Sequence, residues 1–350
     1  MSNKKTLRWV IAHHPVSLFE RTAKLFKQEL EKECPNQFNL EIYTPGTYDN
    51  KFKNHPEFKI VPPDVNGLEE RPSSIKSLNG EEVQLKKQKL WSEAKGRWTS
   101  FFNALRDGDF EISQTQVGIV GGFLDRNYHA IDLPFLFNGH DHVSKVLDNE
   151  IGDYMSDNLA RKTGVRGLAF TYSGGYRVIG AKKGITALSD LSALKLVTHT
   201  AHSDELFNNV GAKTLRKDKA TIEDVADLNK DENGAIETTY LRFAGKNVLK
   251  TQHSMFTTTI LTGDKFWNTL TSEQQSAFKR IAKVVAKEER KWSLQDSAAY
   301  EANAQANGVT ITEINKSDLA KLQESAKKVY SNLDNIGIDK KLVDRIIAAA

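Results

Sequence analysis

Arg177 and a set of mostly neutral polar residues stand where short apolar strands of this sequence end. Imidazole, hydroxyl, amide and carboxyl groups donate and accept hydrogen bonds, and the forked donors of arginine match the two oxygens of a carboxylate. Such side chains, gathered in a cleft, bind a small polar solute and pair its groups as water leaves. The residues expected to contact the solute are Arg177, His13, His14, Gln116, Thr198, His199, Glu237, Thr238, Tyr240 and Thr258.

Catalytic and metal-binding patterns are weak by comparison. The sequence has no Gly-x-Ser-x-Gly elbow, P-loop or His-Glu-x-x-His helix, so we predict no catalytic residue and no enzyme activity. His199, His202 and Glu205 could place two ligands near one helical turn, but no second metal motif accompanies them. We therefore predict neither a metal nor a cofactor. An enzyme remains the third alternative, after two kinds of binding protein, and turnover of a bound solute would reveal it.

The elements that position these side chains alternate between strand and helix patterns. Residues 7–12 and 38–42 read as strands around an amphipathic helix, which predicts a parallel pair with a crossover helix. Open α/β sheets bind ligands beyond the carboxyl ends of their strands. Further strands are predicted at 110–112, 167–172, 176–180, 194–198, 212–215, 234–239 and 251–261.

A long helix near the C-terminus predicts two lobes. Thr271 and Gln274 form a capping box, and the apolar pattern runs on to about Asn307. A helix of ~36 residues is ~54 Å long, which exceeds one lobe. Lobe I is predicted at 5–173, with a surface insertion at about 45–90, and lobe II at 174–254. Residues 255–295 are predicted to return to lobe I and begin the spanning helix, and 296–350 to contain the end of that helix and the C-terminal helices.

Composition excludes several classes of protein. The chain has 350 residues, of which 39% are hydrophobic and 27% charged, the profile of a folded globular protein. Its 49 basic and 45 acidic residues are interspersed, so no basic cluster points to nucleic acid. No apolar run reaches the ~18 residues of a membrane span, so the chain is not expected to be membrane-embedded. The single Cys34 forbids an internal disulfide.

Several segments together resemble one family. They are 175–180 around Arg177, the Asp-Leu-x-x-Leu-Lys strand at 190–195, 133–135, 234–237 and Trp267 before the long helix. In their order and spacing they resemble the DctP-type extracytoplasmic solute-binding proteins of TRAP transporters. The resemblance covers nearly the whole chain outside about 45–90. It implies an α/β, two-lobed periplasmic-binding-protein-like fold of type II, with lobes joined by crossing strands and a spanning helix.

The resemblance also implies a function. Such a receptor closes on a small solute, usually an organic acid, and delivers it to the TRAP membrane permease subunits. It would work in the periplasm as a mature protein whose signal peptide has been removed. A receptor that acts in the cytoplasm, or one in which a cation bridges the solute, is the rival among binding proteins.

The sequence departs from the family pattern at one position that bears on which solute is bound. Relatives carry an arginine after the Asp-Leu-x-x-Leu-Lys strand that pairs with the carboxylate, and this chain has Val197 there. Arg177 resembles a second family arginine and could hold a carboxylate alone, or His199 or His14 could replace the missing group. The alternative is a neutral polyol, a sugar-like solute or a partly apolar one.

Overall fold

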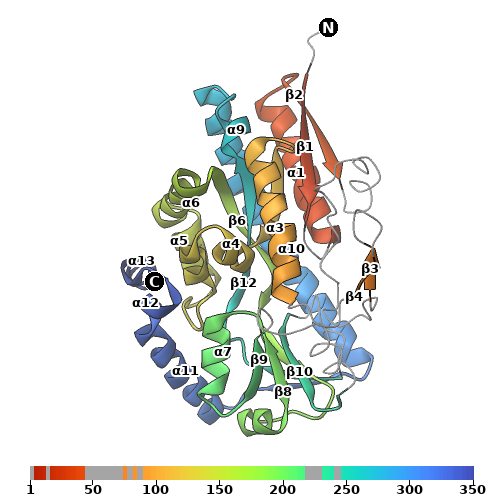
Figure 1. The fold of residues 1–350 in the computed structure, drawn as a ribbon, viewed down its shortest axis with the longest axis vertical. Coiled ribbons are helices and arrows are strands. Elements are labelled where there is room, and N and C mark those ends of the chain that lie inside the picture. The colour runs from red at the N-terminus through yellow and green to blue at the C-terminus, as the bar shows by residue number, and fades with distance from the viewer. Residues whose placement is uncertain are drawn as a thin grey trace.

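Two β-sheets organise the molecule, one in each lobe (Figure 1). The computed structural model describes residues 4–12, 16–43, 74–76, 82–84, 90–216, 231–239 and 246–350. The lobe I sheet has the order β2-β1-β5-β12-β6, and the lobe II sheet has the order β13-β11-β7-β10-β8-β9. The predicted two-lobed α/β fold is confirmed.

Lobe I begins with the predicted strand–helix–strand unit. β1 (Lys5–Ile11) pairs in parallel with β2 (Phe38–Tyr43), and α1 (Val16–Glu33) connects them. Aromatic rings fill the space between β1, α1 and the long helix: the ring centroids of Trp9 and Phe26 are 5.3 Å apart, and those of Phe26 and Phe278 are 5.7 Å apart. Burial of large apolar side chains on one face of each element holds the sheet and helices together.

The rest of the lobe I sheet comes from distant parts of the chain. Its strands are β5 (Ile112–Gln116), β6 (Val165–Tyr176) and β12 (Met255–Gly263), and β12 pairs antiparallel with both β5 and β6. The helices around it are α3 (Leu90–Asp107), α4 (Val117–Phe123), η2 (Arg126–Asp132), α5 (His140–Leu147), α6 (Glu150–Thr163) and α9 (Asp264–Trp267).

Lobe II contains the remaining strands of the two large sheets. They are β7 (Val178–Ala181), β8 (Lys195–Thr198), β9 (Lys213–Arg216), β10 (Gly234–Thr238), β11 (Asn247–Lys250) and β13 (Thr310–Glu313), with η3 (Leu188–Ala193) and α7 (Ala201–Asn208) between them. β13 pairs in parallel with β11, whereas the sequence had predicted only helices after the spanning helix. A strand of four residues carries too short an alternation to be recognised without its partner.

In the described part of the chain, three segments cross between the two large sheets. β6 continues through Arg177 into β7, residues 251–254 lead from β11 back to β12, and α10 (Ser272–Ala306) passes along both lobes (Figure 1). The capping box of Thr271 and Gln274 begins α10 as predicted. Ser297 of this helix donates to the carbonyl of Gly174, and Glu301 pairs with Lys250 of lobe II at 2.9 Å. Gly174 has φ 94°, in the left-handed region that glycine adopts without strain.

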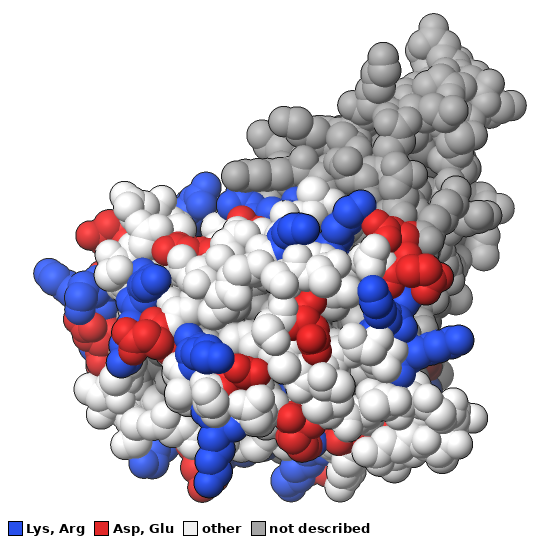
Figure 2. Space-filling view, turned by 90° about the horizontal axis from the view of Figure 1, so that it is seen from below, with Lys and Arg blue, Asp and Glu red and all other residues white. Residues whose placement is uncertain are grey.

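The C-terminal helices are α11 (Lys316–Ser331), α12 (Leu333–Ile336) and α13 (Lys340–Ala348). Within the predicted insertion, β3 (Ser74–Lys76) and β4 (Glu82–Gln84) form an antiparallel ribbon. No helix in the described part of the chain has the length and apolar character needed to cross a bilayer. On the face shown in Figure 2, blue and red side chains are intermixed, in keeping with their interspersion along the sequence.

Candidate functional site

Arg177 lies at the junction of the lobes, between the end of β6 and the start of β7. Its backbone N–H donates to the carbonyl of Ser254 on the other crossing segment, at 2.8 Å. Its side chain is 1% exposed, and its guanidinium lies over the ring of Phe256, 4.4 Å from the centroid. The crossing segments and the aromatic ring therefore fix both the position and the plane of the guanidinium.

Two carboxylates surround this guanidinium. Nη2 donates to both oxygens of Asp132, at 2.8 and 3.0 Å, and Nε lies 3.5 Å from Oε1 of Glu237. Nη1 is buried and has no hydrogen-bond partner among the described residues. Burial alone would lower the pKa of Arg177, but the charges of Asp132 and Glu237 raise it above its ordinary value, so the guanidinium stays charged.

Glu237, on β10, is fully buried and accepts hydrogen bonds from lobe II and from a crossing segment. Oε1 accepts from the hydroxyl of Ser203 at 2.9 Å and lies 3.1 Å from Nε2 of His253, and Oε2 accepts from the backbone N–H of His199 at 3.1 Å. Burial alone would raise the pKa of Glu237, but Arg177, His199 and His253 hold it well below its ordinary range. The carboxylate is therefore ionised and saturated by internal partners.

Asp132, the last residue of η2, brings lobe I into the same cluster. Besides its two bonds from Arg177, its Oδ2 lies 3.7 Å from Nε2 of His202, on α7 of lobe II. Burial alone would raise the pKa of Asp132, but Arg177 and His202 lower it below its ordinary value. We call Asp132, Arg177, His202, Glu237 and His253 the junction cluster; its members come from both lobes and from both crossing segments.

Several predicted site residues lie at or near this cluster. A Cβ built on Gly118 would lie 3.3 Å from Nε2 of Gln116 and 3.8 Å from Oδ2 of Asp132, so Gln116 lies close to the lobe I side of the cluster. Thr198 ends β8, and its hydroxyl donates to Asp204 at 3.1 Å. Thr238 follows Glu237, and its hydroxyl donates to the carbonyl of Thr239 at 3.3 Å.

Val197, at the position where the family resemblance led us to expect an arginine, is 2% exposed in the middle of β8. The junction cluster therefore contains one guanidinium beside two carboxylates.

Other predicted residues do not meet there. His13, His14 and Tyr240 lie outside the described residues. The structure places Thr258 in a different cluster, inside lobe I: its hydroxyl contacts that of Thr171 at 2.5 Å and accepts from Nε2 of Gln114 at 3.3 Å. Successive residues of a strand face opposite sides of a sheet, and Thr258 faces the side that α10 covers.

That second cluster contains a buried acid from the spanning helix. Glu289 of α10 accepts the backbone N–H of Tyr172 at 2.9 Å, and its other oxygen lies 3.5 Å from Nε2 of Gln114. Burial raises the pKa of Glu289 to about 8, against smaller lowering effects from Tyr172, Arg290 and Gln114. The carboxyl is therefore protonated at neutral pH in the folded protein.

Sequence reasoning missed three members of the junction cluster. Asp132 stands alone within the apolar run Ile131–Phe135, and it is not among the residues expected from the sequence to contact the solute. A single acid in an apolar run is a usable signal, because such a carboxylate must be paired when it is buried. The sequence suggests His202 only as part of a weak metal-binding pattern, and His253 is not among the expected solute contacts. In the described part of the chain, no group of His, Cys, Asp and Glu residues is arranged to hold a metal ion.

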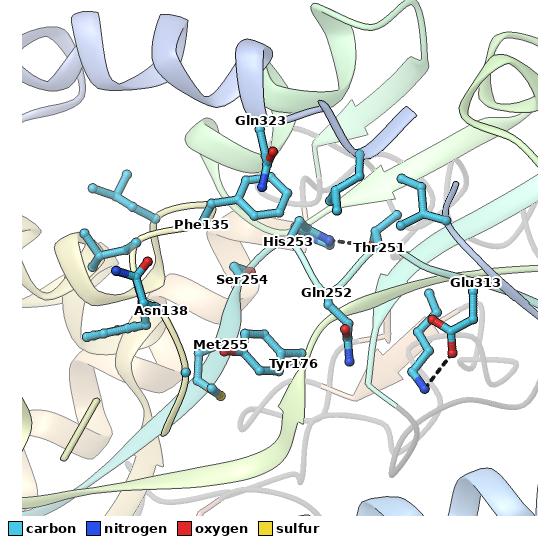
Figure 3. A pocket seen from close by; sticks show the side chains of 17 residues that line it. Phe135, Asn138, Tyr176, Thr251, Gln252, His253, Ser254, Met255, Glu313 and Gln323 are labelled. Carbon is cyan, nitrogen blue, oxygen red and sulfur yellow. Dashed lines mark hydrogen bonds and ion pairs between the residues drawn. The ribbon is translucent and has the colours of Figure 1, made fainter. Parts of the chain in front are cut away.

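A cavity of about 400 Å³ lies against the crossing segments (Figure 3). His253 and Ser254 line it from one crossing segment and Tyr176 lines it from the other. His253 also contacts Thr251 at 2.8 Å, the dashed line in Figure 3, while its Nε2 reaches Glu237. The histidine thus connects the wall of this cavity to the junction cluster.

Two α/β lobes, joined by crossing strands and a spanning helix around a buried polar junction, are the architecture of a protein that binds a small ligand between its lobes. The family model of the bacterial extracellular solute-binding protein, family 7 (DctP), matches residues 95–216 and 234–335. That is well over half of the chain, so the protein belongs to this family. It is a TRAP-type extracytoplasmic receptor for small solutes.

Known proteins agree with this assignment. The C4-dicarboxylate-binding periplasmic protein DctP of Vibrio cholerae is 25% identical over 261 residues, which cover 70% of this chain and 75% of that protein. The sugar acid binding protein DctPAm of Advenella mimigardefordensis, solved with galactonate, has a TM-score of 0.73 at 17% identity, with 100% of this chain and 98% of that chain covered. A TRAP periplasmic solute binding protein of Shewanella oneidensis with bound succinate has a TM-score of 0.69 at 15% identity, with 99% of each chain covered.

Proposed function

We propose that this protein is the periplasmic receptor of a TRAP transporter, which closes on one small oxygen-rich solute and passes it to the membrane permease subunits without chemical change. The observation that carries the proposal is the buried Arg177 at the lobe junction, with Nη1 lacking a partner among the described residues. An unpaired buried donor is costly, and an oxygen of a bound solute would satisfy it. We place Gln116, His199 and Thr238 around the solute, and Thr198 and Glu237 as positioning residues.

An organic acid is the first candidate solute. The Advenella protein binds galactonate and the Shewanella protein binds succinate. A carboxylate oxygen on Nη1 of Arg177 would make a charge-assisted hydrogen bond, which contributes about 1.5–3 kcal/mol. His13, His14 and Tyr240 remain predicted contacts on the same solute.

A neutral, hydroxylated solute is the second candidate. Two observations favour it: Val197 supplies no guanidinium, and Arg177 already faces Asp132 and Glu237. A hydroxyl or carbonyl oxygen can accept from Nη1 without bringing a further negative charge to these carboxylates.

Capture of a solute tests the receptor function. The protein is incubated with a small-molecule extract, desalted and measured by native mass spectrometry, and small-angle scattering follows its radius of gyration. We expect one retained small molecule and a smaller radius in the loaded protein, because the lobes close on the solute. Conversion of the retained molecule into a product would show an enzyme instead. A protein that retains nothing from any extract and never changes shape would refute the receptor function.

Introducing the family arginine should not by itself create an acid-binding site. In Val197→Arg the new side chain enters a buried position in β8, between Ile236 and Leu215 on the neighbouring strands. We expect a stability loss of about 1–3 kcal/mol from overpacking. Affinity for succinate and galactonate, measured by titration calorimetry, should stay within about threefold of wild type.

Lys195→Arg is the matched control for this variant, because Lys195 lies on the same strand and is exposed. It should leave stability and affinity unchanged. A Val197→Arg protein that binds either acid about tenfold more tightly than wild type would contradict the prediction.

A further inference from the structure

Both carboxylate-binding edges of Arg177 are already engaged. A guanidinium pairs with a carboxylate through two parallel N–H groups, either Nη1 with Nη2 or Nε with Nη2. Each of these pairs requires Nη2, and Nη2 donates to both oxygens of Asp132. The remaining member of the side edge, Nε, lies 3.5 Å from Glu237. Among the described residues, Nη1 is therefore the one donor of this guanidinium left without a partner, and a solute oxygen bound to Nη1 cannot form the bidentate pair.

The charges of the junction cluster disfavour an acid as well. Arg177 is buried with two ionised carboxylates. His202 lies beside Asp132, while His199, His253 and the Ser203 hydroxyl contact Glu237, so Arg177 is the one guanidinium shared by both acids among the described residues. A solute carboxylate on Nη1 would share one guanidinium with Asp132 in a buried site. Like charges close together in such a site repel each other strongly.

We propose that Asp132 determines the charge of the accepted solute: it holds Arg177 as an internal ion pair, so that Nη1 receives a hydroxyl or carbonyl oxygen of an uncharged, hydroxyl-rich molecule. The inference rests on the proposed receptor function and chooses between its two candidate solutes. The amide of Gln116, at the end of β5 in lobe I, and the hydroxyl of Thr238, at the end of β10 in lobe II, suit the remaining hydroxyl groups of such a molecule.

A purely structural ion pair and a selectivity device predict different results when Asp132 loses its charge. If the ion pair only stabilises the junction, Asp132→Asn lowers the stability of the protein and weakens the binding of all solutes alike. If Asp132 determines the charge of the accepted solute, the same change frees Nη2 of Arg177 and removes the repelling carboxylate. The affinity for acids then rises relative to the affinity for neutral solutes. The decisive readout is the ratio of two affinities, which a general loss of stability does not move.

The test uses acids and alcohols with the same carbon skeleton: galactonate with galactitol, and gluconate with glucitol. Wild type, Asp132→Asn and Asp132→Glu are titrated with all four by calorimetry. We expect wild type to favour the alcohol, Asp132→Asn to shift the ratio toward the acid by about tenfold or more, and Asp132→Glu to stay within about threefold of wild type. An unchanged ratio in Asp132→Asn, or no gain of acid binding by that variant, overturns the inference.

The solute that wild type itself retains gives an answer that does not depend on a variant's folding. A neutral molecule, identified by mass spectrometry after release, supports the role of Asp132, and an acid overturns it while leaving the receptor function intact. Failure to retain any solute counts against the receptor function instead. The two failures are therefore distinguishable.

Discussion

Replacing Arg177 by alanine should both weaken solute binding and destabilise the protein. The variant leaves Asp132 and Glu237 buried without their cation, and breaking a buried ion pair by removing one partner costs about 3–5 kcal/mol. It also removes the donor Nη1 proposed for the solute. We expect a loss of affinity of about tenfold or more, since one charge-assisted hydrogen bond contributes at least this much.

Thermal unfolding and calorimetry on the same preparations measure the two effects. Arg280→Ala is the matched control, because Arg280 pairs with Glu33 on the surface and such pairs contribute about 0–1 kcal/mol. Arg177→Lys keeps the positive charge but replaces the forked guanidinium by a single ammonium group. Its unfolding temperature and its solute affinity should both lie between those of wild type and Arg177→Ala. Unchanged affinity in Arg177→Ala would remove Arg177 from the solute site, and an unchanged unfolding temperature would contradict the junction cluster.

Glu289 should make the protein less stable as the pH rises toward 8. The folded pKa of Glu289 is about 8 and its ordinary value is 4.5, so between these values the folded state binds a proton that the unfolded state has released. Stability falls with pH wherever the folded state binds more protons, and the shift corresponds to a total of about 5 kcal/mol across this window. The contribution is complete below about pH 4.5 and is lost as the pH approaches the folded pKa.

Glu289→Gln tests this directly. Glutamine has the shape of the protonated acid, and its amide oxygen can accept the N–H of Tyr172, but it does not titrate. Urea unfolding at pH 5, 6, 7 and 8 should show that the variant gains stability relative to wild type as the pH rises. Titration of the junction cluster is common to both proteins and cancels in the difference.

Glu288→Gln is the neighbouring control, since Glu288 is exposed beside Lys291 and should follow the wild-type pH dependence. A constant difference between Glu289→Gln and wild type from pH 5 to 8 would mean that Glu289 is ionised in the folded protein.

The cluster around Glu289 and the junction cluster hold successive parts of one crossing segment, β6 and the Arg177 that follows it. Glu289 and Ser293 of α10 accept hydrogen bonds from the backbone N–H groups of Tyr172 and Gly174. The spanning helix is therefore bonded to β6 up to the point where β6 crosses between the lobes. Beyond that point, Arg177 is held by side chains from both lobes. Because Asp132 belongs to lobe I and Glu237 to lobe II, we expect a change in the arrangement of the lobes to alter the contacts that both make with Arg177.

The sequence by itself determined the elements whose signals are local. The β1–α1–β2 unit follows from the periodicity of apolar residues such as Leu7, Phe26 and Leu40, and the start of α10 follows from Thr271 and Gln274, three residues apart. It also singled out Arg177 and Glu237 as functional polar residues at strand ends. Each of these signals lies within one turn or one strand, where spacing alone fixes which side chains share a face.

Only the tertiary structure decided which polar residues meet. Asp132 and His202 lie on opposite sides of Arg177 in the sequence and join its cluster because η2 and α7 meet at the junction, where the rings of His129 and His202 are 5.8 Å apart. Thr258 is excluded because β12 inserts between β5 and β6 in a register that turns its hydroxyl toward Gln114 and Thr171. A shift of one residue reverses the face of every side chain in a strand, and that register is set by long-range pairing. Burial then selects the partners, because a charge removed from water must find an opposite charge nearby, whatever its position in the sequence.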